Sequence, residues 1–149
     1  MIIIAFINNL GEIQNIVSPG ADSDYIDGQE YGNLIAKHLP VDTDWGTAIE
    51  TYIFKDGAWT TRPRRPSEFH YWSADGWVKN TPNLLDSIIS ARNSKLFASD
   101  WTQLPDSPLS ESKKEEWRVY RQTLRDFPDT LDLNSINSLS DVVWPTPPA

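Results

Sequence analysis

The residue types that usually carry catalysis or bind metals are few in this chain, and their spacing fits neither role. The 149 residues include no cysteine and only two histidines, His38 and His70, which are far apart in the sequence. A solitary histidine without metal-ligand spacing is more often a surface or packing residue. A Gly-x-Ser-x-Gly motif, a phosphate loop and a dinucleotide fingerprint are also missing. We therefore expect a protein that is not an enzyme, with no catalytic, cofactor-binding or metal-binding residues.

Charged residues form two clusters that each allow a second interpretation. The three carboxylates could hold calcium, but the rest of an EF-hand loop is missing, so a solvated acidic loop is expected at Asp22, Asp24 and Asp27. The three guanidinium groups are expected in a hydrated connector, or facing an acidic partner, at Arg62, Arg64 and Arg65.

Overall charge and the N-terminal residues exclude two classes of partner. The formal net charge is -8, and nucleic-acid binding needs a basic surface, so we expect no nucleic-acid partner. Residues 1–7 are apolar, but they are too few to span a bilayer and no positive segment precedes them. They are expected to form a buried first strand, and we expect neither export nor a membrane partner.

Aromatic residues are the unusual feature of the composition, with seven Trp, five Tyr and five Phe. A buried Trp removes roughly 200 Å² from water, worth about 5 kcal/mol before entropy is counted. The rings must therefore anchor a core or an interface. Trp59, Trp72 and Trp77 are predicted to be cross-strand partners, and a carbohydrate-binding platform is an alternative use of the same rings.

The N-terminal half is predicted to be β-rich. Strands are expected at 2–7 and 12–17, joined by a turn at 8–11 that contains Asn and Gly. Residues 18–32 carry many turn formers and are expected to form a surface loop. A third strand is expected at 34–39 and should end before Pro40.

Two Asp-Gly turns, at Asp56-Gly57 and Asp75-Gly76, predict two short hairpins in tandem. Proline punctuates the connector at residues 62–69, which can continue neither a ladder nor a helix. We expect the two hairpins to complete a β-meander whose strands are 51–54, 58–61, 70–72 and 77–79.

Helical signals begin at Thr81, an N-cap residue followed by Pro82. A helix is predicted over 82–98, with one face formed by Leu85, Ile88, Ile89, Arg92 and Leu96. A loop is expected at 99–109, where two prolines occur.

A second helix is expected to begin at Ser110 or Ser112, and Ser112 with Glu115 matches a capping box. Pro128 should end it, and residues 129–149 should be extended. The helix carries an apolar stripe at helical spacing, formed by Trp117, Tyr120, Leu124 and Phe127. The predicted fold is α+β: antiparallel hairpins or a meander in a module of residues 1–80, then a helical hairpin with an extended tail in residues 81–149.

Residues 100–106 read Asp-Trp-Thr-Gln-Leu-Pro-Asp, and Trp117-x-x-Tyr-Arg-x-x-Leu-Arg-Asp follows before a terminal Trp144-Pro145. Over residues 92–145 this order of motifs resembles the phage tail assembly chaperone family, which includes tail-fibre assembly proteins. The first half of the chain looks like the small β-modules of tail-fibre-associated phage proteins. One departure is the run at 129–141, which is longer and richer in Asn and Ser than the family pattern.

The resemblance implies a protein that binds the phage tail fibre protein, as an assembly chaperone or as a fibre-associated component of the virion. It implies action in the host cytoplasm during assembly or a place in the virion tail, in a homo- or hetero-oligomer. The alternative is a glycan-binding, receptor-binding or baseplate module. The candidate partner-binding residues are Trp59, Trp72, Trp77, Trp101, Trp117, Tyr120, Arg121, Arg125 and Trp144.

The motif also has a physical interpretation, in which a helical hairpin encloses the aromatic rings. Arg121 and Arg125 lie one turn apart, and they are expected to bond the carbonyls of the loop, or Asp100 and Asp106. The motif either binds a partner directly or only stabilises this small domain.

Overall fold

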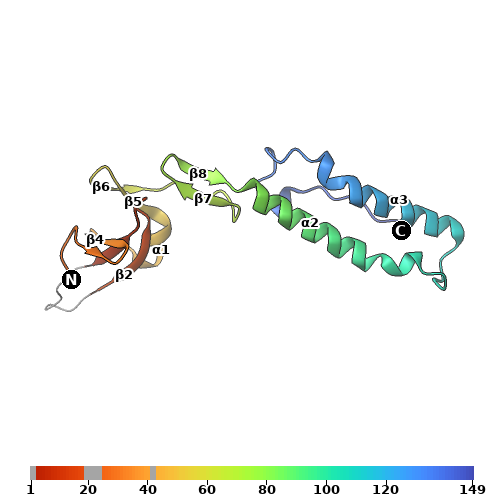
Figure 1. The fold of residues 1–149 in the computed structure, drawn as a ribbon, viewed down its shortest axis with the longest axis horizontal. Coiled ribbons are helices and arrows are strands. Elements are labelled where there is room, and N and C mark those ends of the chain that lie inside the picture. Colours follow the sequence, from red (N-terminus) through yellow and green to blue (C-terminus); the bar gives the residue numbers. More distant parts are fainter. Residues whose placement is uncertain (1–2, 19–24, 41–42) are drawn as a thin grey trace. The chain divides into compact units, whose positions relative to one another are not determined.

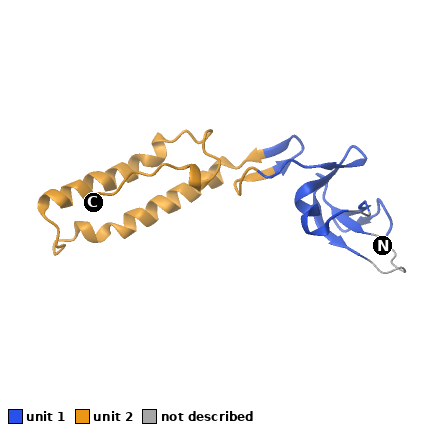
Figure 2. Cartoon of the chain, turned by 180° about the vertical axis from the view of Figure 1, so that it is seen from behind, with its two compact units in different colours: residues 1–65, 72–77 blue, residues 66–71, 78–149 orange. Residues whose placement is uncertain are grey.

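The computed structural model describes residues 3–18, 25–40 and 43–149, and the chain divides into two compact units. The first comprises residues 1–65 and 72–77, drawn in blue in Figure 2; the second comprises residues 66–71 and 78–149, drawn in orange. Antiparallel strands come first and helices follow, so the predicted α+β class is confirmed. The boundary predicted at residue 80 stays a prediction.

Unit 1 is built around a four-stranded antiparallel sheet with the order β2-β1-β4-β3. Strand β1 is central and all four of its residues are buried, because alternate β-branched and aromatic side chains enter apolar clusters on both faces. The first two expected strands and the third are confirmed, while the short β3 lies in the segment predicted as loop. The bounds are Ile4–Ile7 (β1), Ile13–Val17 (β2), Glu30–Tyr31 (β3) and Leu34–His38 (β4).

The turn between β1 and β2 requires glycine at position 11. Gly11 has a φ of +78°, and a Cβ there would lie 1.9 Å from the carbonyl oxygen of Phe54. This close approach allows the Phe54 amide to donate to the Gly11 carbonyl at 3.0 Å. The Asn8 side chain completes the turn by accepting from the amides of Leu10 and Glu12, each at 3.0 Å.

A short helix that the sequence analysis missed, α1 (Trp45–Thr51), precedes the first Asp-Gly hairpin. Asp44 caps it by accepting from the Gly46 amide at 3.0 Å. Seven residues are too few to show a clear period, and Ala48 is the one buried residue of the helix. Asp44 at the N-cap position was the signal available in the sequence.

Both Asp-Gly hairpins form, but the predicted continuous meander is wrong, because each hairpin is a separate two-stranded sheet. Asp56 and Gly57 both have positive φ, as the tight turn requires. Prolines in the connector supply no amide for a ladder, so pairing stops between the two hairpins. Their strands are Tyr52–Lys55 (β5), Ala58–Thr61 (β6), His70–Ser73 (β7) and Gly76–Lys79 (β8).

Unit 2 is a helical hairpin in which α2 (Thr81–Ala98) and α3 (Glu111–Asp126) lie side by side (Figure 1). Asn80, not Thr81, caps α2 by accepting from the Asn83 amide at 3.1 Å. The buried face of α2 carries Leu84 and Ile88. Ile88 was predicted on this face, whereas Leu84 takes the place of the predicted Leu85. A 3-10 helix, η1 (Asp100–Gln103), occupies the start of the predicted loop.

Ser110 caps α3, accepting from the Lys113 amide at 3.2 Å. The capping box predicted for Ser112 is wrong, because Glu115 bonds to Arg118 instead. The predicted apolar stripe of α3 is confirmed, since Tyr120, Leu124 and Phe127 are buried and Trp117 is half-buried. The helix gives way to a 3-10 turn, η2 (Phe127–Thr130), that contains Pro128.

The prediction of an extended C-terminal tail is wrong for residues 129–141, which contain 3-10 turns, whereas residues 142–149 form neither helix nor strand. After η2 the chain turns back over the helical hairpin and forms another 3-10 turn, η3 (Leu139–Asp141). The Lys79 ammonium anchors it by donating to the carbonyls of residues 133, 134 and 136 at 2.8 to 3.0 Å. Apolar tail side chains complete the core over Leu84, Ile88 and Phe127; they are Leu131, Leu133, Ile136, Leu139, Val142 and Trp144. The run that departs from the family pattern therefore supplies core residues.

Candidate partner-binding site

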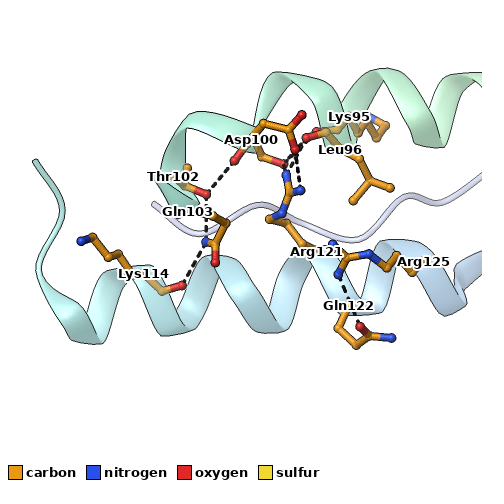
Figure 3. A network of polar contacts seen from close by, with 10 residues as sticks. Lys95, Leu96, Asp100, Thr102, Gln103, Lys114, Arg121, Gln122 and Arg125 are labelled. Atoms are coloured by element: carbon orange, nitrogen blue, oxygen red, sulfur yellow. Dashed lines mark hydrogen bonds and ion pairs between the residues drawn. The ribbon is translucent and has the colours of Figure 1, made fainter. Parts of the chain in front are cut away.

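Arg121 is the polar centre of the helical hairpin, although it belongs to the apolar side of α3. One guanidinium nitrogen donates to the Leu96 carbonyl at 2.6 Å and to the Ser99 hydroxyl at 2.7 Å, and the other donates to the Asp100 carboxylate at 2.5 Å (Figure 3). Arg121 is 8% exposed. A positive group here also complements the partial negative charge at the C-terminal end of α2. The predicted contact of Arg121 with Asp100 is confirmed, while the carbonyl that it bonds is that of Leu96 in α2 and not one of the predicted loop.

Thr102 and Gln103 extend this network, a role that the sequence analysis missed. Thr102 is fully buried and donates to the Ser99 carbonyl at 2.6 Å. The Gln103 amide donates to the Thr102 hydroxyl at 3.1 Å and to the Lys114 carbonyl at 3.3 Å (Figure 3). Both residues lie in the motif of residues 100–106, and that motif was the signal in the sequence that could have indicated their role. They fix η1 against the start of α3.

Trp101 lies in the same turn but takes no part in that network. The residue is 47% exposed, and its ring packs against Trp117, with the ring centres 6.5 Å apart. Trp117 in turn makes an edge-to-face contact with Tyr120 at 5.5 Å. Burial raises the pKa of the Tyr120 hydroxyl above its ordinary value, so that group stays protonated. The structure thus brings three predicted residues together as one row of rings, hereafter the ring row.

Tyr120 also lines a groove of about 500 Å³ between α3 and the end of the chain. The α3 wall presents Val119, which is 54% exposed. Two carboxylates on this wall form ion pairs within the helix: Glu116 lies 2.7 Å from the Lys113 ammonium, and Glu115 is bonded to Arg118. The arginine lowers the pKa of Glu115, so this carboxylate is ionised at neutral pH. The groove is lined by Glu115, Glu116, Val119, Tyr120, Thr123, Pro145, Thr146 and Pro148.

The predicted contact of Arg125 with the loop or with Asp106 is wrong. The Arg125 guanidinium instead donates to the Gln122 side chain at 3.4 Å, and its carbonyl accepts from Arg92 at 3.1 Å. Successive residues on a helix differ by about 100°, so the four-residue step from Arg121 turns Arg125 slightly around the helix and moves it away from η1.

Trp144 is partly buried and packs against the core of unit 2. Its ring centre is 5.0 Å from that of Phe127, and the Lys95 ammonium lies 5.1 Å from the ring centre. This placement explains the terminal Trp-Pro motif as a closure of the core.

The tryptophans of the β half pack within unit 1. Trp59 is edge-to-face with Phe54 at 5.2 Å, and its indole N–H donates to the His38 carbonyl at 2.7 Å. Trp72 and Trp77 are edge-to-face at 5.1 Å across their hairpin, and Trp77 donates to the Pro63 carbonyl at 2.7 Å. These contacts account for the rings as cross-strand partners. The carbohydrate-binding use stays a prediction.

Arg62 is not the hydrated residue that the sequence analysis expected. Its side chain is 8% exposed, lies 2.9 Å from the Glu12 carboxylate and donates to the Ile49 carbonyl at 2.7 Å. Its guanidinium also lies 4.9 Å from the Trp77 ring centre and 5.5 Å from that of Trp72. Arg62 therefore joins separate elements of unit 1, while the neighbouring Arg64 and Arg65 are exposed.

Asp22 and Asp24 lie outside the described residues, while Asp27 lies 3.8 Å from Lys37 and accepts from the His38 amide. His70 is buried, and its ring bonds the Ser67 hydroxyl at 2.9 Å. Within the described ranges no three His, Asp or Glu side chains are grouped as a metal site would require. No helix in those ranges has the length and apolar character needed to cross a membrane.

The geometry defines an α+β protein whose helical hairpin is closed by a buried arginine and presents an exposed tryptophan. Residues 85–149 match the model of the phage tail assembly chaperone protein family. Over these residues the resemblance stated from the motifs is confirmed. The match also spans the Asn- and Ser-rich run at 129–141.

The match supports a role in phage tail assembly, in which the protein interacts with phage tail components. Such a chaperone acts in the host cell during virion assembly. Neither a search of the curated proteins nor a search of the solved structures found a match to the chain.

Proposed function

We propose that this protein is a tail-fibre assembly chaperone that binds the phage tail fibre protein through its helical hairpin. The exposure of Trp101 is the observation that carries the proposal. Trp101 is 47% exposed, although the turn that bears it is fixed by buried polar contacts. The buried contacts of Arg121 and Thr102 stabilise the hairpin. Stability of the hairpin does not explain why Trp101 is exposed.

A fixed, partly exposed tryptophan suits a protein interface. Trp is enriched among the residues that dominate binding energy. Because η1 is already held by Arg121 and Gln103, little conformational freedom is lost when a partner covers the ring. The Trp117 ring packs against the Trp101 ring and adds apolar area to the same surface.

The proposed partner is the fibre protein while it folds or assembles in the host cytoplasm. The chain then either leaves the finished tail or stays as a fibre-associated component. Mass spectrometry of purified virions distinguishes these outcomes: a fixed stoichiometry indicates a structural component, and absence indicates a transient chaperone.

Co-expression with the neighbouring tail fibre gene tests the proposal. We expect the two proteins to co-purify and the soluble fraction of the fibre protein to increase. Trp101→Ala should weaken the complex by about 2 kcal/mol, or about thirtyfold in Kd, without unfolding the hairpin. Val143→Ala is the matched control, because Val143 is 86% exposed in the same unit but outside the ring row. Clean separation of two correctly folded proteins would contradict the proposal.

A further inference from the structure

The ring row leads from the exposed Trp101 to a second surface, the groove between α3 and the end of the chain. Trp101 contacts Trp117, Trp117 contacts Tyr120, and Tyr120 lines the groove. Val119 is 54% exposed on the groove wall. An apolar surface that continues from the proposed binding residue is a candidate for further contact with the same partner.

The dimensions of the groove fit a short extended segment. Its α3 wall runs from Glu115 to Thr123, which is about 12 Å at 1.5 Å per residue. An extended chain covers that length with about four residues, at roughly 3.3 Å each. The volume of about 500 Å³ is in the usual range of binding pockets, roughly 300–1,000 Å³.

The opposite wall limits how such a segment can bind. Pro145 and Pro148 lie on this wall, and proline has no amide hydrogen to donate. Strand addition along this wall is therefore disfavoured, and side-chain packing against proline and against Val119 is favoured.

The acidic side chains of the groove favour an occupant that carries a positive charge. Glu115 and Glu116 line it, and none of the described residues that line it is a lysine or an arginine. Both carboxylates are exposed and pair with cations of α3, and a new cation can share or replace these contacts. A second copy of this chain carries the same net charge of -8, so long-range repulsion disfavours it.

We propose that this groove binds an extended segment of the tail fibre protein, about four residues long, that combines an apolar or proline residue with lysine or arginine. The apolar residue packs on Val119 and Tyr120, and the cation meets Glu115 and Glu116. The inference rests on the proposed function and names the part of the partner that the chaperone recognises.

Val119→Asp tests the groove in the full chain co-expressed with the fibre protein. The exposed site accepts the new side chain without a core cavity, and the added charge places a hydrated group where the apolar residue must pack. We expect at least tenfold weaker binding. Val143→Asp adds the same charge at an exposed valine outside the groove and should leave binding unchanged. Equal thermal melting of the two variants would show that both fold.

The chemistry of the segment is tested with labelled ten-residue peptides that overlap along the fibre protein, measured by fluorescence anisotropy. The tightest peptides should carry Lys or Arg within about four residues of an apolar residue or proline. They should bind Glu115→Gln/Glu116→Gln at least fivefold more weakly than the unchanged chain, and the difference should shrink in high salt. Tight binding of acidic peptides, or equal binding to this variant, would overturn the inference.

The results separate the two proposals. If the unchanged chain does not co-purify with the fibre protein, the proposed function fails. If it co-purifies and Val119→Asp does so equally well, the function stands and the groove inference fails. If sedimentation shows a dimer of this chain that Val119→Asp dissociates, the occupant is a second copy and the inference is overturned.

Discussion

Removal of the Arg121 guanidinium should destabilise unit 2 far more than removal of an exposed arginine on the same helix. Arg121→Met keeps the apolar stem of the side chain and deletes the three hydrogen bonds to Leu96, Ser99 and Asp100. Hydrogen bonds that involve a charged group contribute about 1.5–3 kcal/mol each. The sum of three such values overestimates the loss, because the acceptors keep other partners.

The contacts that remain in Arg121→Met indicate a smaller loss in the free energy of unfolding. The Leu96 carbonyl still accepts from the Ser99 amide at 3.1 Å and from the Ser99 hydroxyl at 2.9 Å. The Asp100 side chain is 56% exposed, so water replaces the guanidinium there. Breaking a fully buried ion pair costs about 3–5 kcal/mol. With one partner half exposed, we expect a loss of about 2–3 kcal/mol in the free energy of unfolding.

Urea denaturation followed by tryptophan fluorescence measures this loss. Arg118→Met is the matched control, because Arg118 pairs with Glu115 through side chains that are 63% and 55% exposed. Water and salt screen such a surface pair, so its loss should change stability far less than the loss of the Arg121 contacts. The reasoning is refuted if the two variants lose equal stability, or if Arg121→Met loses less than about 0.5 kcal/mol.

Two further predictions concern the tail and the ring row. Lys79→Met removes the ammonium that three tail carbonyls share, so hydrogen exchange at residues 133–136 should accelerate and stability should fall by about 1–3 kcal/mol. Lys113→Met, at a partly exposed lysine of α3 that bonds no tail carbonyl among the described residues, should show neither effect. Burial raises the pKa of Tyr120 above its ordinary value near 10, so its stabilising contribution is complete below about pH 10 and is lost as pH rises through the folded pKa. Tyr120→Phe should therefore flatten the alkaline decrease in unfolding free energy; an unchanged slope would contradict the assignment.

The sequence by itself determined the elements whose signals are local. Asp56-Gly57 specifies a tight hairpin through positive φ at both positions, and the structure has it. Pro82 and the apolar spacing near it specify α2, although the side chain of Asn80 rather than Thr81 caps it. The order of motifs after residue 92 predicted the family resemblance that the match over residues 85–149 confirms. Each of these signals is complete within a few residues or within one repeating pattern.

Only the tertiary structure decided which motif residues serve the hairpin and which face outward. Arg121 and Arg125 are the same residue type one turn apart. Arg121 lies on the side of α3 that contacts α2 and makes the buried bonds there, whereas the Arg125 guanidinium bonds Gln122 of its own helix. Trp101 and Thr102 are neighbours, yet the turn buries the threonine and exposes the tryptophan. Such choices depend on contacts between segments distant in sequence.

The tail shows the same limit most clearly. Its apolar residues have no helical or strand period, so local patterning predicted an extended segment. Ile136 and Val142 are buried and four others are partly buried, because the hairpin leaves an apolar face uncovered and Lys79 holds the returning chain by its carbonyls, whereas Val143 is 86% exposed. Burial of this kind depends on the surface that another part of the chain presents. The tail sequence alone therefore left it undetermined, and the folded hairpin fixed it.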